Sequence, residues 1–245
     1  MMTYAGGQNI CGATIGVLCL ESYFPKPPGH IKNPSALPFP VLYEMIDGVN
    51  VPDLLQNPSR DMLEPFLAGA RRLEREGVRA ITGSCGFLAL FQKELSAAVD
   101  VPVFSSSLVQ VPLAFQLAGG VAPVGILTAD ASALTDRHMA AVGAGGVPVV
   151  VEGLENTQEF AAVILRNERH CLDLEKVEHE VLHAVRALQK RSPDLRSLVL
   201  ECTDLPPYAE RIQKELKMPV FDLTTLATMV HSVVARQGYR GIMPW

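Results

Sequence analysis

Cys85 and Cys202 stand at matching positions in two halves of a chain that repeats itself. In each half a short apolar run ends at the cysteine, over residues 78–85 and 195–202, and a Pro-Val-Phe segment follows at the same distance. Two similar halves that face each other place one thiol on each side of a shared cleft. A pair of acid–base groups on opposite faces of a carbon is the arrangement that inversion of a stereocentre requires.

The sequence around these cysteines alternates short runs rich in β-branched residues with longer segments whose apolar residues recur at helical spacing. This alternation is typical of βαβ units and a parallel sheet. Strands are predicted over residues 14–20, 41–45, 78–82, 101–104, 124–128, 148–152, 197–200 and 218–221. Helices are predicted over residues 59–76, 87–99, 107–117, 132–142, 157–169, 174–190, 206–216 and 224–236. Near-continuous apolar strands fit a sheet that is covered on both faces. We therefore predict an α/β fold of two pseudo-symmetric α/β/α halves with mostly parallel sheets and the active site between them.

The expected domain boundaries follow the repeat. Residues 1–105 together with 222–245 form a first domain that carries Cys85, and residues 106–221 form a second domain that carries Cys202. Residues 24–40 break the symmetry, because six prolines prevent a regular helix there. This segment follows the carboxyl end of the first strand, the edge where open α/β sheets bind ligands. It is either a rigid surface loop or a substrate lid.

Each of the two cysteines lies where a strand ends and a helix begins. Backbone N–H groups at that position stabilise a thiolate and lower the pKa of the thiol toward the working pH. Gly86 and Thr203, which follow the two cysteines, allow a sharp turn and offer a further donor. A free cysteine is more often a small buried apolar residue. The matched positions of these two favour chemistry, whereas the unmatched cysteines at positions 11, 19 and 171 keep the structural interpretation.

Residues 200–206, Leu-Glu-Cys-Thr-Asp-Leu-Pro, resemble the Gly-Cys-Thr-His-hydrophobic-Pro segment of the aspartate/glutamate racemase superfamily. Residues 125–128 resemble the strand of that family whose threonine helps to hold the substrate carboxylate. The resemblance covers most of the chain and implies a cofactor-independent racemase in which Cys85 and Cys202 are the acid–base pair. It further implies that Thr128 and Thr203 contact the carboxylate of a small substrate.

Several positions depart from the pattern of that family. Gly86-Phe87 stands where glutamate racemases have Asn-Thr, which favours a less polar substrate and leaves recognition of an α-amino group in question. Asp204 replaces the histidine after the Cys-Thr pair, and Glu21-Ser22 offers, two residues later, the acid and hydroxyl of the family's Asp-Ser-Gly. With Gly86 as a backbone donor and Ser84 as a helper, these residues complete the predicted binding set.

Other functions remain open on the sequence alone. Within the superfamily they are hydantoin racemase, maleate cis–trans isomerase and arylmalonate decarboxylase, the last using one cysteine. A cysteine hydrolase needs a histidine base, and no histidine shows a recognisable spacing to either cysteine. A non-catalytic ligand-binding protein is the alternative of a different class, and the retention of both thiols argues against it.

Residues 179–183 match the zinc-protease pattern His-Glu-x-x-His. On the predicted helix the apolar residues Leu174, Val177, Val181, Val185 and Leu188 share one face, and both histidines point away from it. We therefore interpret the match as a coincidence and predict no metal site. The glycine-rich residues 143–146 lack a phosphate-binding pattern and are predicted to be a turn.

The composition and charge of the chain disfavour several classes of binding partner. The chain has 245 residues, a net charge of −5 and no dense run of Lys or Arg, so a nucleic acid or an anionic membrane is not expected as a partner. No apolar stretch approaches the roughly 20 residues that span a bilayer, and no secretion signal is expected. Five cysteines without framework spacing favour reduced thiols and a cytoplasmic location. A homodimer is an expectation by analogy with proteins of this build.

Overall fold

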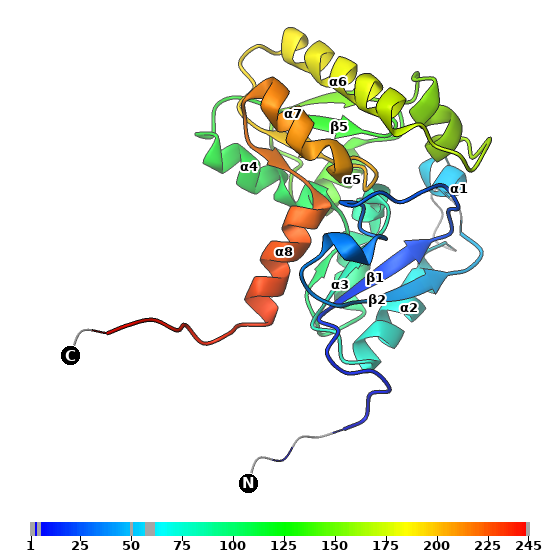
Figure 1. Ribbon diagram of the computed structural model, residues 1–245, viewed down its shortest axis with the longest axis vertical. Helices are drawn as coiled ribbons and strands as arrows, with labels where there is room; N and C mark the ends of the chain where they lie inside the picture. The colour runs from blue at the N-terminus through cyan, green and yellow to red at the C-terminus, as the bar shows by residue number, and fades with distance from the viewer. Residues whose placement is uncertain (1–2, 4–5, 50, 57–61, 244–245) are drawn as a thin grey trace.

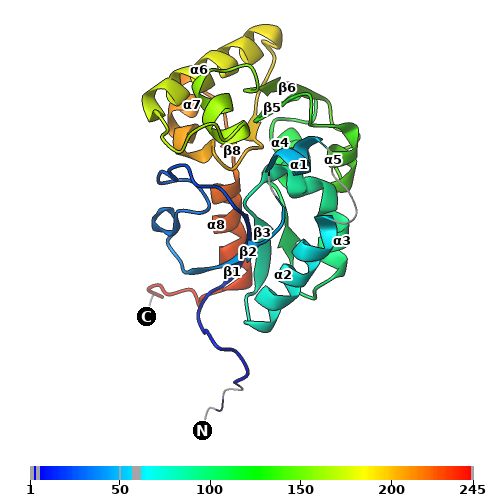
Figure 2. The ribbon, with the colours of Figure 1, turned by 90° about the vertical axis from the view of Figure 1, so that its right-hand side faces the viewer.

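The computed structural model describes residue 3 and residues 6–49, 51–56 and 62–243, and it contains two four-stranded parallel sheets (Figures 1 and 2). The first sheet has the order β2-β1-β3-β4, with β1 at Ile15–Leu20, β2 at Val41–Ile46, β3 at Ala80–Gly83 and β4 at Val103–Phe104. The second has the order β6-β5-β7-β8, with β5 at Val124–Thr128, β6 at Val149–Gly153, β7 at Leu198–Leu200 and β8 at Val220–Phe221.

The two sheets repeat one topology, which confirms the predicted α/β fold of two related halves. In each sheet the first strand of the half lies between the second and third strands, and all six pairings are parallel. Gly16 of β1 pairs with Ile81, and its counterpart Gly125 of β5 pairs with Leu198. Every residue of β1 and β5 is buried, as expected for strands covered on both faces.

Helices cover both faces of each sheet. On the first sheet, α2 (Leu63–Arg75) packs on one face through a cluster with Leu18 and Ile81, and α8 (Leu223–Val234) packs on the other through Leu226 and Ala227. On the second sheet, α6 (Leu174–Arg191) and α7 (Ala209–Leu216) cover one face, and α4 (Val111–Leu117) and α5 (Asp136–Ala141) cover the other. Because α8 returns to the first sheet, we retain as a proposal the division into residues 1–105 with 222–245 and residues 106–221.

The helices differ from the prediction in their details. The segment predicted as one helix over 87–99 is a 3-10 turn, Gly86–Phe91, followed by α3, Gln92–Ala97. The helix predicted over 157–169 is reduced to a π-helical turn at Ala161–Leu165, because Asn167 adopts a left-handed φ of 52°. α1, Val51–Gln56, was not predicted. Of the helix predicted over 59–76, residues 59–61 lie outside the described residues.

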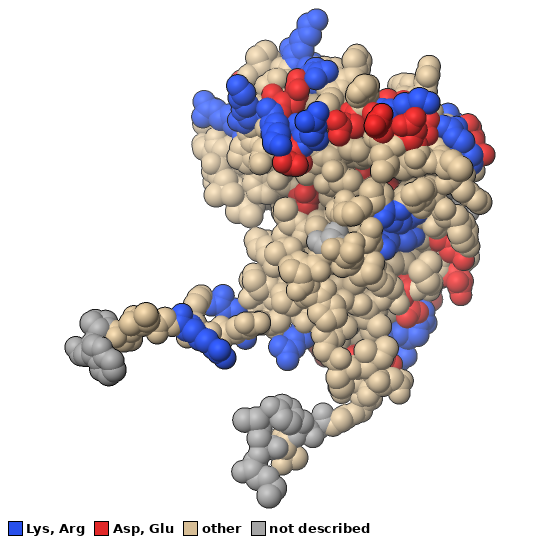
Figure 3. All heavy atoms as spheres, in the orientation of Figure 1, with Lys and Arg blue, Asp and Glu red and all other residues tan. Residues whose placement is uncertain are grey.

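The exterior carries charges of both signs. Figure 3 shows Lys and Arg next to Asp and Glu over α6 and α7, where Arg186 pairs with Glu215 and Arg211 pairs with Glu178. Exposed pairs of this kind stabilise the fold by less than about 1 kcal/mol each. Among the helices of the described residues, none has the length and apolar character needed to cross a membrane.

Candidate active site

Both cysteines line one cavity between the two halves, at the carboxyl ends of the central strands. The space between its lining residues, with the solvent at its opening included, measures about 490 Å³. Its first-half wall follows β1 and β3, its second-half wall follows β5 and β7, and α1 and the π-helical turn close one side. The lining residues are Leu20, Ser22, Phe24, His30, Lys32, Val51, Leu55, Ser84, Cys85, Gly86, Phe87, Ala129, Ile164, Leu165, Glu201, Cys202, Thr203 and Asp204. The predicted facing thiols are therefore brought to one cavity.

Cys85 precedes the first 3-10 turn of its half in an extended conformation, with φ −144° and ψ 126°. Burial raises the pKa of the Cys85 thiol well above its usual range, and the charge of Glu201 adds to the rise. The backbone N–H groups of Phe87 and Leu88 act in the opposite direction and are outweighed. The prediction that the helix start lowers this pKa is wrong, because one short turn of N–H groups compensates only part of the cost of burying a thiolate.

Cys202 lies in the equivalent position of the second half and is also almost fully buried. Its Sγ donates to Oδ2 of Asp204 at 3.4 Å. Burial raises the pKa of the Cys202 thiol well above its usual range, and the charges of Asp204 and Glu201 raise it further. Here too the predicted lowering is wrong. The shifts of both pKa values favour the protonated thiols, and a positive charge placed near either sulfur would favour its thiolate.

Glu201 continues β7 into the cavity and was not predicted as a site residue. Its side chain is 1% exposed, and burial raises the pKa of the carboxyl group to about 7. The hydroxyl of Thr128 donates to Oε2 at 2.7 Å, whereas Oε1 has no hydrogen-bond partner among the described residues. Glu201 packs so closely on Gly86 that a Cβ at position 86 would lie 2.1 Å from Oε1.

The predicted binding residues fall into two groups. Ser22, Ser84, Gly86, Thr203 and Asp204 line the cavity, whereas Glu21 is exposed and Thr128 lies behind Glu201, and neither lines it. The Thr203 hydroxyl donates to the Ser84 carbonyl at 2.7 Å and ties the two halves together. The Ser84 hydroxyl accepts from the Leu20 N–H at 3.1 Å. Several of the predicted hydroxyls are thus committed to the protein itself, and Thr128 reaches the cavity only through Glu201.

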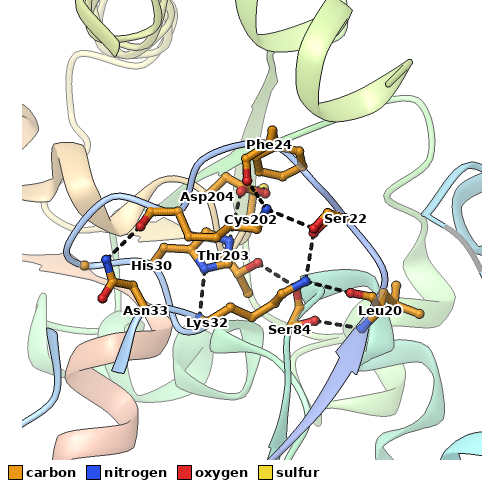
Figure 4. A network of polar contacts seen from close by, with 12 residues as sticks. Leu20, Ser22, Phe24, His30, Lys32, Asn33, Ser84, Cys202, Thr203 and Asp204 are labelled. Carbon is orange, nitrogen blue, oxygen red and sulfur yellow. Dashed lines mark hydrogen bonds and ion pairs between the residues drawn. The ribbon is translucent and has the colours of Figure 1, made fainter. Parts of the chain in front are cut away.

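The proline-rich residues 24–40 form one wall of the cavity, which Figure 4 shows together with the cysteine of the second half. Nδ1 of His30 accepts from the Lys32 N–H at 2.9 Å, so Nε2 carries the proton that faces Oδ1 of Asp204 at 3.0 Å. Burial alone would raise the pKa of Asp204, but His30, Cys202 and Lys26 together outweigh it and hold that pKa below its usual value. This buried pair joins the loop to the residue that contacts Cys202.

Lys32 brings a positive charge to the cavity from the same loop. Its Nζ donates to the Leu20 carbonyl at 2.7 Å and to the Ser22 hydroxyl at 2.8 Å. Burial lowers the pKa of the Lys32 ammonium. A lysine ammonium carries three donors, so one N–H remains for an anionic ligand. The cavity thus combines two thiols, two carboxyl groups, an imidazole and an ammonium, which is a set suited to binding a carboxylate and moving a proton beside it.

The His-Glu-x-x-His pattern has a structural explanation. His179 and His183 are exposed on α6. The carboxylate of Glu180 accepts the backbone N–H groups of residues 158–160 at 2.7–2.9 Å and so caps the start of the following π-helical turn. The predicted buried face is confirmed apart from Leu174, which is 42% exposed at the first position of the helix. Within the described residues, no group of three or more His, Cys, Asp or Glu is placed to hold a metal ion.

Comparison with known proteins identifies the family. The family model of the Asp/Glu/Hydantoin racemases matches residues 38–230. The chain belongs to this family. The fold agrees, because unliganded arylmalonate decarboxylase superposes with a TM-score of 0.60 over 93% of this chain and 94% of that one, at 17% identity. An aspartate racemase homologue from Pyrococcus horikoshii OT3 gives a TM-score of 0.59 over 91% and 99%, at 18% identity.

Curated proteins of similar sequence are named as lyases, whereas the family model is named for racemases. A dimethylsulfoniopropionate lyase from Durusdinium sp. clade D is 29% identical over 87% of this chain and 72% of its own length. Dimethylsulfoniopropionate lyase 5 from Emiliania huxleyi is 28% identical over 89% of this chain and 45% of its own length. The chain thus spans between about half and three quarters of the length of these relatives. Membership of an enzyme family is shown, and the reaction type within it differs among the relatives.

Proposed function

We propose that this protein is a cofactor-independent lyase that removes the proton beside the carboxylate of a 3-sulfoniopropionate and expels a neutral sulfide. The observation that carries the proposal is the cavity in which Cys85, Cys202 and the ammonium of Lys32 meet. The names of the relatives supply the substrate class, because dimethylsulfoniopropionate has a carboxylate at one end and a sulfonium at the other.

The reaction balances without a redox partner. A thiolate takes the proton from the carbon next to the carboxylate, and the electrons of that C–H bond form the C=C bond of acrylate. The C–S bond breaks, its electron pair stays on sulfur, and dimethyl sulfide leaves. The proton ends on the cysteine and is returned to solvent. Cys85 and Cys202 are the two candidates for the base, and a positioned base of this kind contributes about 10²–10⁴-fold.

The charges around the cavity suit such a dipolar substrate. Lys32 pairs with the carboxylate and stabilises the charge that develops there when the proton leaves. The sulfonium needs the opposite environment, which the aromatic side chain of Phe87 and the ionised Asp204 in the cavity lining supply. The negative charge of Asp204, which contributes to the raised pKa values of both thiols, is compensated when this cation binds, so the substrate itself lowers the cost of forming the thiolate.

Racemisation of an amino acid or a related carboxylate is the second candidate. It is favoured by the matched positions of the two thiols in the two halves, since one base and one acid on opposite faces invert a carbon. The two candidates make different demands. An elimination requires one base, whereas racemisation requires both thiols.

The test is to incubate the protein with dimethylsulfoniopropionate and to measure dimethyl sulfide by gas chromatography and acrylate by proton NMR. We expect equal amounts of the two products. A parallel series in D₂O with D- and L-amino acids and hydantoins measures exchange of the α-proton. Exchange into both enantiomers without any sulfide release would replace the lyase proposal with the racemase.

A further inference from the structure

One carboxyl oxygen in the cavity is left without a partner. Oε1 of Glu201, a residue that lines the space between the two halves, is buried and has no hydrogen-bond partner among the described residues. A buried unpaired carboxylate oxygen is costly, so a group of this kind is either protonated or occupied by a ligand. Gly86 leaves room for this oxygen, because a Cβ there would lie 2.1 Å from it.

The hydrogen bonds of Glu201 locate its proton. The Thr128 hydroxyl donates to Oε2 at 2.7 Å, which marks Oε2 as the acceptor oxygen. In a protonated carboxyl group the hydroxyl is then Oε1, which lies against Gly86 in the lining of the cavity. Burial raises the pKa of this carboxyl to about 7, which agrees with a group that is neutral in weakly acidic solution. A protonated Glu201 therefore has an unused donor in the lining of the cavity.

We propose that Glu201 is a further catalytic residue, whose Oε1–H donates a hydrogen bond to the carboxylate of the substrate. The hydrogen bond between a carboxylic acid and a carboxylate is charge-assisted and short, and it strengthens as the α-proton leaves and charge moves onto the carboxylate oxygens. Glu201 and Lys32 then hold the same carboxylate from the two halves of the molecule. The inference rests on the proposed function for its catalytic part, whereas the contact with a carboxylate can be tested by itself.

The groups that face Glu201 line the same cavity, apart from Thr128, which lies behind it. Cys85 and Gly86 approach from the first half, Cys202 and Asp204 from the loop after β7, and Thr128 from β5. Lys32 and His30 line the cavity from the proline-rich loop. Because several of these groups titrate, a pH effect is assigned to Glu201 only as the difference between the protein and its Glu201→Gln variant. Glutamine keeps an N–H donor at the same place and does not titrate.

The experiment measures the dissociation constant of propionate, a carboxylate without a leaving group, by NMR titration at pH 6 and pH 8. Binding needs the protonated acid, so affinity is full below pH 7 and falls above it. We expect Kd to rise about tenfold from pH 6 to pH 8 in the wild type and to stay constant in Glu201→Gln. Glu159→Gln is the matched control, since Glu159 is buried and paired with Arg169 outside the cavity, and it should keep the tenfold change. In turnover, Glu201→Ala should lose about 10²–10³-fold in kcat and Glu201→Gln less.

Two results would overturn the proposed hydrogen bond from Glu201 to the carboxylate. One is a wild type that binds propionate equally well at both pH values, and the other is a Glu201→Gln variant that keeps the tenfold change. Failure of propionate to bind at pH 6 does the same. The two proposals fail separately. A pH-dependent affinity without sulfide release removes the lyase and leaves the carboxylate contact, and sulfide release with pH-independent binding removes only the role of Glu201.

Discussion

Replacing Gly86 by alanine tests how tightly the cavity is built. A Cβ at position 86 would lie 2.1 Å from Oε1 of Glu201 and 2.2 Å from its backbone carbonyl oxygen, where an ordinary contact begins at 3.4 Å. The carboxyl group can turn, but the backbone cannot move freely, because the Glu201 N–H donates to Leu127 at 2.8 Å in the second sheet. The two halves must separate by more than about 1 Å or the turn after Cys85 must shift. Overpacking of this severity costs about 3 kcal/mol.

For a chain of this length, a loss of about 3 kcal/mol lowers Tm by roughly 6–12 °C. A shift of about 1 Å between the reacting groups lowers turnover by about 10²-fold. Circular dichroism melts and product formation measure the two effects. Gly146→Ala is the matched control, since a Cβ there meets nothing within 4 Å. A Gly86→Ala protein with the melting temperature and turnover of the wild type would refute the close packing of Glu201 on this turn.

Three further predictions concern the polar groups around the cavity. Thr128→Val removes the hydroxyl that favours ionised Glu201, so the pH at which propionate binding is half lost should rise; an unchanged midpoint in the NMR titration would contradict the role of Thr128. Lys32→Met keeps the length of the side chain and removes its charge, and it should raise KM for a carboxylate substrate by about 10–100-fold and also lower kcat, because Lys32 stabilises the charge that develops on the carboxylate. Steady-state kinetics with unchanged KM would argue against Lys32 as the carboxylate partner. The Glu201 carboxyl has a pKa of about 7 when folded and an ordinary value of 4.5, so the folded state holds more protons between these values and stability falls as pH rises through that range. The free energy of unfolding in urea is measured for the wild type and for Glu201→Gln at pH 5 and at pH 7.5. Relative to the wild type, the variant should be more stable at pH 7.5 than at pH 5 by up to ~3 kcal/mol. A difference between the two proteins that is the same at both pH values would show that the carboxyl is ionised at both.

The sequence predicts much of the fold because the signals are local. Each of the eight strands is a short β-branched apolar run, and all eight are present with small changes at their ends. The repeat places Cys85 and Cys202 at equivalent strand ends, and equivalent ends of related halves meet in one cavity. The ends and types of the helices were harder to predict from the sequence. Asn167 ends a helix through its own φ, and the 3-10 turn after Cys85 begins at Gly86, which packs directly on Glu201 of the other half.

The charged residues of the cavity depend on tertiary structure. His30 and Lys32 lie in the proline-rich loop, and their place beside Asp204 and Leu20 follows from how that loop folds back. The sequence does contain a signal for Glu201. An acidic residue directly follows a fully buried strand, at the position that Ser84 occupies in the first half. The shift in the pKa of each thiol was predicted in the wrong direction. The sequence pattern reveals the N–H groups at the start of a helical turn, but it does not reveal the burial and the nearby carboxylates that outweigh them.

The most direct test of the central claim follows dimethyl sulfide release and deuterium uptake from D₂O in the wild type, Cys85→Ala and Cys202→Ala. If a cysteine in this cavity removes the proton beside the carboxylate, the wild type releases dimethyl sulfide and at least one of the two variants loses the activity by 10²-fold or more, a loss of about the size of one general base. Sulfide release that is unaffected by both substitutions would contradict the account.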